Sequence, residues 1–114
     1  MASSFRQLAV NFSTADAERP VLEYRAGTLT VRFVDWEERE VLLQFPEVAG
    51  YRWQDDECLP PGVRDDVSYE IMDSPWVVEL RRLGAAGVEH RHFKLCFNAV
   101  GVLDIVSEAF TEGQ

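Results

Sequence analysis

Two histidines and a cysteine form a group of side chains that could bind a metal ion. His90, His92 and Cys96 are separated by even numbers of residues, so on a β-strand all three point to the same face. Imidazole and thiolate are zinc ligands, and such a set could hold zinc. Lys94 stands on the same face, however, and no fourth ligand follows from the spacing. We therefore expect no metal and no other cofactor, with two solvated histidines and Cys96 as a small apolar filler.

Neighbouring carboxylates are the second group whose chemistry has to be considered. They are Glu37 and Glu38, the run Asp55, Asp56 and Glu57, and the pair Asp65 and Asp66. General acid–base catalysis needs two carboxyl groups that face each other in a cleft and differ in their surroundings. Neighbouring residues on an exposed loop neither face each other nor differ in their surroundings. These acids are therefore predicted to be a solvated surface.

The chain also lacks the local signature of an activated nucleophile. No serine or cysteine has the flanking glycines of a nucleophile elbow, and Ser74, followed by Pro75, is typical of a helix cap. A hydrolase that depends on His90 or His92 is one class to test, but the sequence favours a protein that is not an enzyme.

The net charge of −9 is confined to the centre of the chain. Residues 35–73 hold twelve acids and three arginines, whereas the acids and bases outside this stretch balance. The twelve acids are Asp35, Glu37, Glu38, Glu40, Glu47, Asp55, Asp56, Glu57, Asp65, Asp66, Glu70 and Asp73. Nucleic-acid binding needs concentrated positive charge and is disfavoured. A basic protein partner is favoured, because clustered charge accelerates association with an oppositely charged surface.

The elements that position these residues read as one β-rich domain over residues 1–114. Leu29, Val31 and Phe33 alternate with polar residues, and the same period of two recurs around residues 41–45 and 93–97. The segments lie too close together for the helical crossovers of parallel strands. We expect an α+β fold, mainly antiparallel β-sheet with about six or seven strands, and one short helix near residues 75–83.

The composition indicates a bacterial, cytoplasmic protein. No apolar run is long enough to span a membrane, and the first residues show no basic stretch followed by an apolar block. Ten of the eleven cationic residues are arginine, a bias typical of GC-rich genomes. Without a sign of export, Cys58 and Cys96 are expected to be reduced.

The acidic stretch is the predicted binding surface. The turn around Glu37–Glu40 and the loop from Asp55 to Asp66 are expected to form one exposed negative face with Trp53 as an aromatic anchor, since tryptophan is enriched at interface hot spots. The predicted contact residues are Glu37, Glu38, Glu40, Trp53, Asp55, Asp56, Glu57, Asp65 and Asp66.

The C-terminal part of the chain resembles a class of small uncharacterised bacterial proteins. The resemblance is carried by the segments 70–76, 92–98 and 101–106, which read EIMDSPW, HFKLCFN and GVLDIV. Some similar small acidic proteins are immunity proteins to secreted polymorphic toxins. The resemblance implies a capped turn, a hairpin and this kind of function, and it transfers no catalytic residue.

These observations predict a non-enzymatic binding protein of the immunity type, which neutralises a basic toxin by covering it with an acidic face. The alternative is a small-molecule-binding or structural domain that forms a homo-oligomer through exposed sheet edges.

Overall fold

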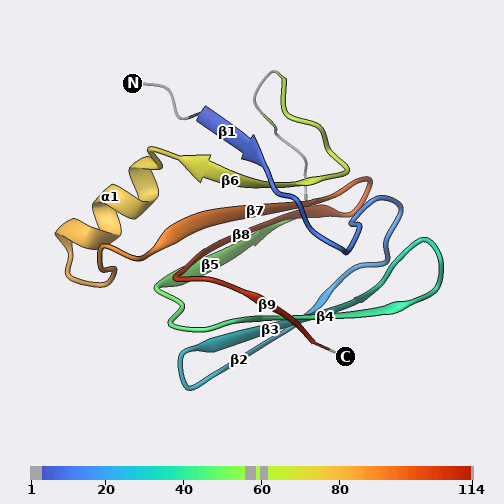
Figure 1. Cartoon of the computed structure of the whole chain (residues 1–114), viewed down its shortest axis with the longest axis horizontal. Helices are drawn as coiled ribbons and strands as arrows, with labels where there is room; N and C mark the ends of the chain where they lie inside the picture. The colour runs from blue at the N-terminus through green and yellow to red at the C-terminus, as the bar shows by residue number, and fades with distance from the viewer. Residues whose placement is uncertain (1–3, 56–58, 60–61, 114) are drawn as a thin grey trace.

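The computed structural model describes residues 4–55, 59 and 62–113, in which nine strands form two antiparallel sheets (Figure 1). Sheet A has the spatial order β1 (Ser4–Gln7), β6 (Ser68–Met72), β7 (Arg91–Phe97), β8 (Gly101–Ser107) and β5 (Gly50–Gln54). Sheet B has the order β2 (Val21–Arg25), β3 (Thr28–Val34), β4 (Glu40–Phe45) and β9 (Thr111–Gly113). The predicted fold class, mainly antiparallel sheet with one short helix, is confirmed, but six or seven strands were too few.

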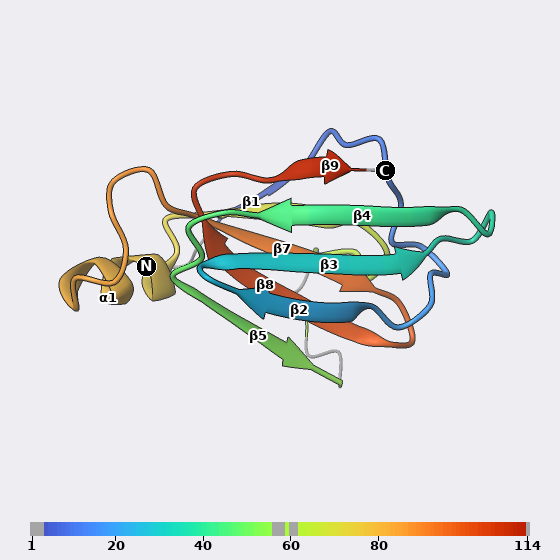
Figure 2. The same ribbon diagram turned by 90° about the horizontal axis from the view of Figure 1, so that it is seen from below.

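The two sheets pack face to face around a shared apolar core, and Figure 1 shows them as two layers. In Figure 2 the view is onto sheet B, with sheet A behind it. Inward-facing residues of β3, such as Leu29 and Val31, meet Phe93 of β7 and Leu103 of β8, and all four are fully buried. This arrangement follows from the period of two, which places every second side chain of a strand on the inner face.

The strands that the sequence did not reveal are short strands at sheet edges. Among the described strands, β1 pairs with β6 alone and β9 with β4 alone. The chain after Phe110 is paired as well, because Thr111 lies opposite Gln44 in the ladder of sheet B. A strand of three or four residues has too few positions to show a period of two, so the pattern missed both.

The helix α1 (Pro75–Arg82) starts and ends as its residue types predict. Ser74 is the N-cap and accepts a hydrogen bond from the Val77 N–H, while Pro75 occupies the first turn. Gly84, with φ at +78°, follows the C-cap residue Leu83. The helix lies at one end of the sandwich, and the turn between β3 and β4 lies at the other (Figures 1 and 2).

The outer face of sheet A carries a second, smaller apolar cluster. Tyr69, Ile71, Cys96 and Val102 are buried there, and the partly buried side chains that pack against them are Phe5, Leu59, Val63 and Val67.

Candidate functional site

The turn between β3 and β4, residues 35–39, is held in one conformation by the side chain of Asp35. Its Oδ1 atom accepts hydrogen bonds from the backbone N–H groups of Glu37 and Arg39, both at 2.9 Å. The Asp35 N–H donates to the Arg39 carbonyl, which closes the turn. The hydrogen bond from the Arg39 N–H is the main cause of the lowered pKa of Asp35, and the one from Glu37 adds to it, against a smaller opposing effect of burial.

This turn exposes a tryptophan among carboxylates. Trp36 is 60% exposed although it is one of the largest apolar side chains. Glu37 is paired with Arg39 at 2.5 Å. Neither Glu38 nor Glu40 takes part in an ion pair within the described residues, so both charges are available to a partner.

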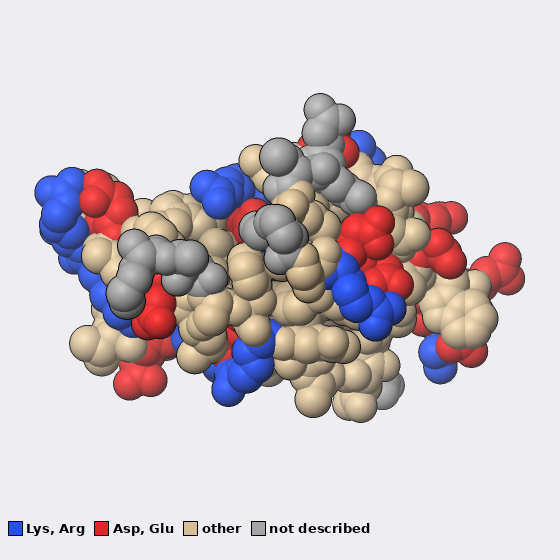
Figure 3. Space-filling view, turned by 90° about the horizontal axis from the view of Figure 1, so that it is seen from above, with Lys and Arg blue, Asp and Glu red and all other residues tan. Residues whose placement is uncertain are grey.

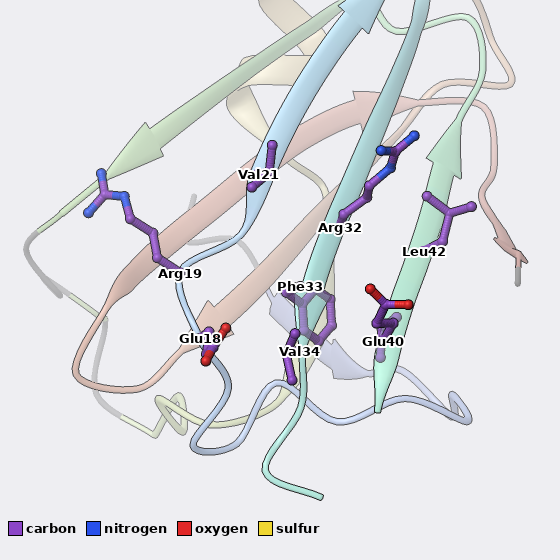
Figure 4. A pocket seen from close by; sticks show the side chains of 9 residues that line it. Glu18, Arg19, Val21, Arg32, Phe33, Val34, Glu40 and Leu42 are labelled. Carbon is purple, nitrogen blue, oxygen red and sulfur yellow. The ribbon is translucent and has the colours of Figure 1, made fainter. Parts of the chain in front are cut away.

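A groove of about 450 Å³ lies beside this turn, on the outer face of sheet B (Figure 4). Val21, Val34 and Leu42 give it apolar walls, and these side chains come from three neighbouring strands. Glu18, Arg19, Arg32 and Glu40 add two charges of each sign (Figure 4). Arg19 is paired with Asp55, whereas Arg32 has no ion pair among the described residues. The groove can therefore hold an apolar group with a polar or charged end.

In the second acidic segment, two of the predicted residues, Asp55 and Asp66, are paired with arginines. Asp55 accepts a hydrogen bond from Arg19 at 2.7 Å, and Asp66 is bonded to Arg64 at 3.0 Å. Asp65 is exposed in the same connection. Asp56 and Glu57 lie outside the described residues.

The two acidic segments belong to different sheets but to the same end of the sandwich. The turn 35–39 follows β3 of sheet B, and the connection 55–67 follows β5 of sheet A; both strands run toward the end opposite α1 (Figures 1 and 2). In the view of Figure 3, the Asp and Glu side chains (red) form several separate groups, and Lys or Arg side chains (blue) lie beside some of them. Several of the acidic groups lie toward the right-hand end of this view.

Trp53, the predicted aromatic anchor, is half-buried. Its ring packs on Phe97 with centroids 6.0 Å apart, Arg19 lies over it, and its indole N–H donates to Asp55. That hydrogen bond, with the one from Arg19, holds the pKa of Asp55 below its ordinary value. Trp36 is the tryptophan that the structure leaves exposed. It was missed because Phe33 and Val34, shortly before it in the chain, made it look like the end of a strand.

His90 and His92 were both expected to be solvated, but His92 is buried, and the two rings make separate sets of hydrogen bonds. His90 precedes β7, and its ring nitrogens contact the Gly87 N–H and the Glu47 carbonyl. His92 lies in β7 and its two ring nitrogens are also occupied, while Cys96 is buried in the outer cluster of sheet A. Across residues 4–55, 59 and 62–113, no three His, Cys, Asp or Glu side chains are grouped so that they could hold a metal ion.

His92 belongs to a buried charged network around Asp104. Asp104, in β8, is fully buried, and the strand register places Lys94 of β7 and Arg52 of β5 directly opposite it on either side. Its carboxylate contacts His92 Nε2 at 2.7 Å, Lys94 Nζ at 3.0 Å and Arg52 Nε at 3.7 Å. Burial raises the pKa of Asp104, but the hydrogen bond from His92 and the charge of Lys94 outweigh it, so the net pKa is lowered.

The same network reaches α1 through Ser74. The Ser74 Oγ atom lies 2.8 Å from His92 Nδ1, and the Trp76 ring stands edge-on against His92 with Arg52 over its face. The sequence suggested the cap but gave no sign of this connection, because Ser74, His92 and Asp104 are brought together only by the pairing of β7 with β8 and the docking of α1.

Comparison with protein-family models, with curated proteins and with solved structures finds no match for the chain. No helix within the described residues is long and apolar enough to cross a membrane.

Proposed function

We propose that the protein is a binding protein whose turn 35–39, with Glu40 and the adjoining groove, binds a basic protein partner. The observation that carries this proposal is Trp36, 60% exposed on a turn that Asp35 holds in place. Exposed tryptophans on ordered segments make strong interface anchors, because they bury a large area and lose little conformational entropy on binding.

The charges around Trp36 support a basic partner. Glu38 and Glu40 have no ion pairs within the described part of the chain, and Glu37 is only partly neutralised by Arg39. Carboxylates at the rim of an interface accelerate association with a cationic surface and select against acidic partners. Tryptophan beside carboxylates also suits arginine and lysine side chains, which stack on its ring and pair with the acids.

The finer proposal is an immunity-type protein of the bacterial cytoplasm that neutralises a basic toxin. Its support is the net charge of −9, the C-terminal resemblance to small bacterial proteins and the arginine-rich composition. A gene next to this one that encodes a large secreted protein with a basic C-terminal domain would identify the partner to test.

The test measures binding of that purified basic domain by calorimetry. We expect Trp36→Ala, and separately a triple change of Glu37, Glu38 and Glu40 to Gln, to weaken binding at least about tenfold at low salt. The matched control neutralises Glu23, Glu89 and Glu108, three exposed acids outside the turn. Equal affinity for all four proteins would refute the proposed surface.

A homo-oligomeric domain is the second candidate, and one observation favours it. The edge strands β2 and β5 lie side by side where Tyr24 and Tyr51 stack at 5.8 Å, and the two rings remain 50% and 42% exposed. An open strand edge beside exposed aromatic rings can pair with a second copy. Light scattering of the purified protein decides this point: a dimer that Tyr24→Ser dissociates supports it, and a monomer at all concentrations excludes it.

A further inference from the structure

Three side chains at the α1 end stand in the order of a hydrolytic triad. The Ser74 hydroxyl lies 2.8 Å from His92 Nδ1, and His92 Nε2 lies 2.7 Å from Asp104 Oδ1. A serine, a base in contact with it and a carboxylate that orients the base form the general arrangement for nucleophilic catalysis, whatever their order in the chain. None of the three residues lies in the turn 35–39 or lines the groove beside it, which form the proposed binding surface.

The charges around Asp104 fix the direction of the hydrogen bonds. Asp104 is ionised, because Lys94 and Arg52 stand beside it, and an ionised carboxylate can only accept. His92 Nε2 therefore carries the proton that it donates to Asp104. In neutral His92, Nδ1 then has a free lone pair, so the Ser74 hydroxyl donates to it, which is the direction that proton transfer from serine requires.

The start of α1 adds positive potential at the serine. Ser74 Oγ accepts a hydrogen bond from the Val77 N–H at 3.3 Å, and it lies at the N-terminal end of the helix dipole. The N–H groups in the first turn of a helix have no acceptor within the helix, and the N–H of Trp76 is one of them. It can donate to a substrate oxygen near Ser74. Both features stabilise negative charge as it develops on or near the serine oxygen.

A pocket of about 250 Å³ borders this serine. It is lined by Ser74 and His92 together with apolar side chains that include Met72, Val77 and Val88. Arg81 and Arg91 also border it, but Arg81 donates to three backbone carbonyls of residues 87–90, and Arg91 is paired with Glu70. The pocket is small, its wall combines apolar with charged side chains, and only 4% of Ser74 is exposed, so the space beside Ser74 limits a ligand to a short acyl group.

We propose that Ser74 is an acyl-accepting nucleophile and that its pocket takes esters of short-chain carboxylic acids. Ser74 Oγ forms a bond to the ester carbonyl carbon while its proton passes to His92 Nδ1. The bond to the alkoxy group then breaks, and that group leaves as an alcohol with the proton from His92. Water, activated by His92 in the same way, releases the acid and restores the serine.

The proposal does not depend on the acidic turn, which lies at the opposite end of the sandwich (Figure 1). The two sites can therefore fail separately: changes at Trp36 should leave acylation unaffected, and changes at Ser74 should leave partner binding unaffected.

The experiment exposes the purified full chain to a fluorophosphonate probe and to p-nitrophenyl acetate, followed by peptide mass mapping. We expect the probe on Ser74 and a hydrolysis rate that falls at least about 100-fold in His92→Gln. Ser74→Asn removes the nucleophile but keeps a good N-cap residue, so it should stay folded and lose both labelling and turnover. Ser13→Ala, a serine outside the pocket, is the control and should behave as the unaltered protein.

Two results would overturn the proposal. One is an unlabelled Ser74 in the folded, unaltered protein; the other is equal labelling and turnover in His92→Gln. Either would leave Ser74 with its role as helix cap alone. Thermal melting of each variant shows whether it is folded, and Asp104→Asn provides an independent variant in case His92→Gln does not fold.

Discussion

The two ends of this sandwich hold their carboxylates in opposite ways. At the α1 end, Asp104 is fully buried and touches His92, Lys94 and Arg52. At the other end, the acids around Trp36 are exposed and only partly paired. The first arrangement holds three strands and a helix together, and the second leaves charge available to another molecule. The position of a carboxylate in the fold, more than the number of carboxylates nearby, therefore indicates what it contributes.

The largest expected effect is the loss of the buried carboxylate. Asp104→Ala leaves Lys94 and His92 without their anion in a site closed to water, and breaking a buried charged pair costs about 3–5 kcal/mol. Urea denaturation measures the free energy of unfolding. Glu112→Ala, at an exposed carboxylate of β9, should change it by less than about 0.5 kcal/mol. A similar small change in both variants would contradict a stabilising role for the network.

Acidification should lower the free energy of unfolding mainly by protonating carboxylates that are paired in the folded protein. The pKa values of Asp104 and Glu70 are both lowered in the folded protein. Burial raises the pKa of Asp104, but the hydrogen bond from His92 and the charge of Lys94 together outweigh it. The main cause of the lowered pKa of Glu70 is the hydrogen bond from Arg91. The unfolded chain has ordinary values near pH 4, so it binds protons first as the pH falls. Their contribution is complete above about pH 5 and is lost as the pH falls through the lower folded-state values.

Urea denaturation from about pH 7 to about pH 3 measures this loss. We expect the free energy of unfolding to decrease below about pH 5, and to decrease less steeply in Asp104→Asn, where one of the two carboxylates is absent. Parallel curves for the two proteins would show that Asp104 titrates normally.

The smallest expected effect on stability is at the exposed end. Trp36→Ala removes a side chain that is 60% exposed and makes no hydrogen bond in the described structure, so the free energy of unfolding should change by less than about 0.5 kcal/mol. Thermal melting checks this. A loss comparable with that of Asp104→Ala would mean that the turn is part of the folded core and would weaken its assignment as a binding surface.

Local patterns in the sequence were sufficient for the elements with strong local signals. The alternation of Leu29, Val31 and Phe33 predicted β3, and Ser74–Pro75 predicted the start of α1. The acidic turn around Glu37 was also placed correctly between two strands. Each of these features depends on residues that are close together in the chain.

The contacts between distant segments could not be predicted in this way. Asp104 lies on the outer face of β8, where a carboxylate usually meets water, and it is buried only because the register sets Lys94 and Arg52 on either side of it. The attachment of β5 beside β8 likewise depends on Gly101, where an added Cβ would come within 2.4 Å of the Gln54 carbonyl oxygen and of the Trp53 ring. Such facts follow from strand register, which no local pattern specifies.

The position of β1 in sheet A has a consequence for the order in which the protein folds. β2, β3 and β4 are joined by short turns and can pair as soon as they meet, whereas β1 pairs with β6, and Arg6 is 64 residues away from its partner Glu70. Closing so long a loop costs more entropy than forming a hairpin, which slows folding in proteins dominated by distant contacts. We therefore expect β1 to join among the last strands, so that β6 presents an open edge to other chains while folding is incomplete.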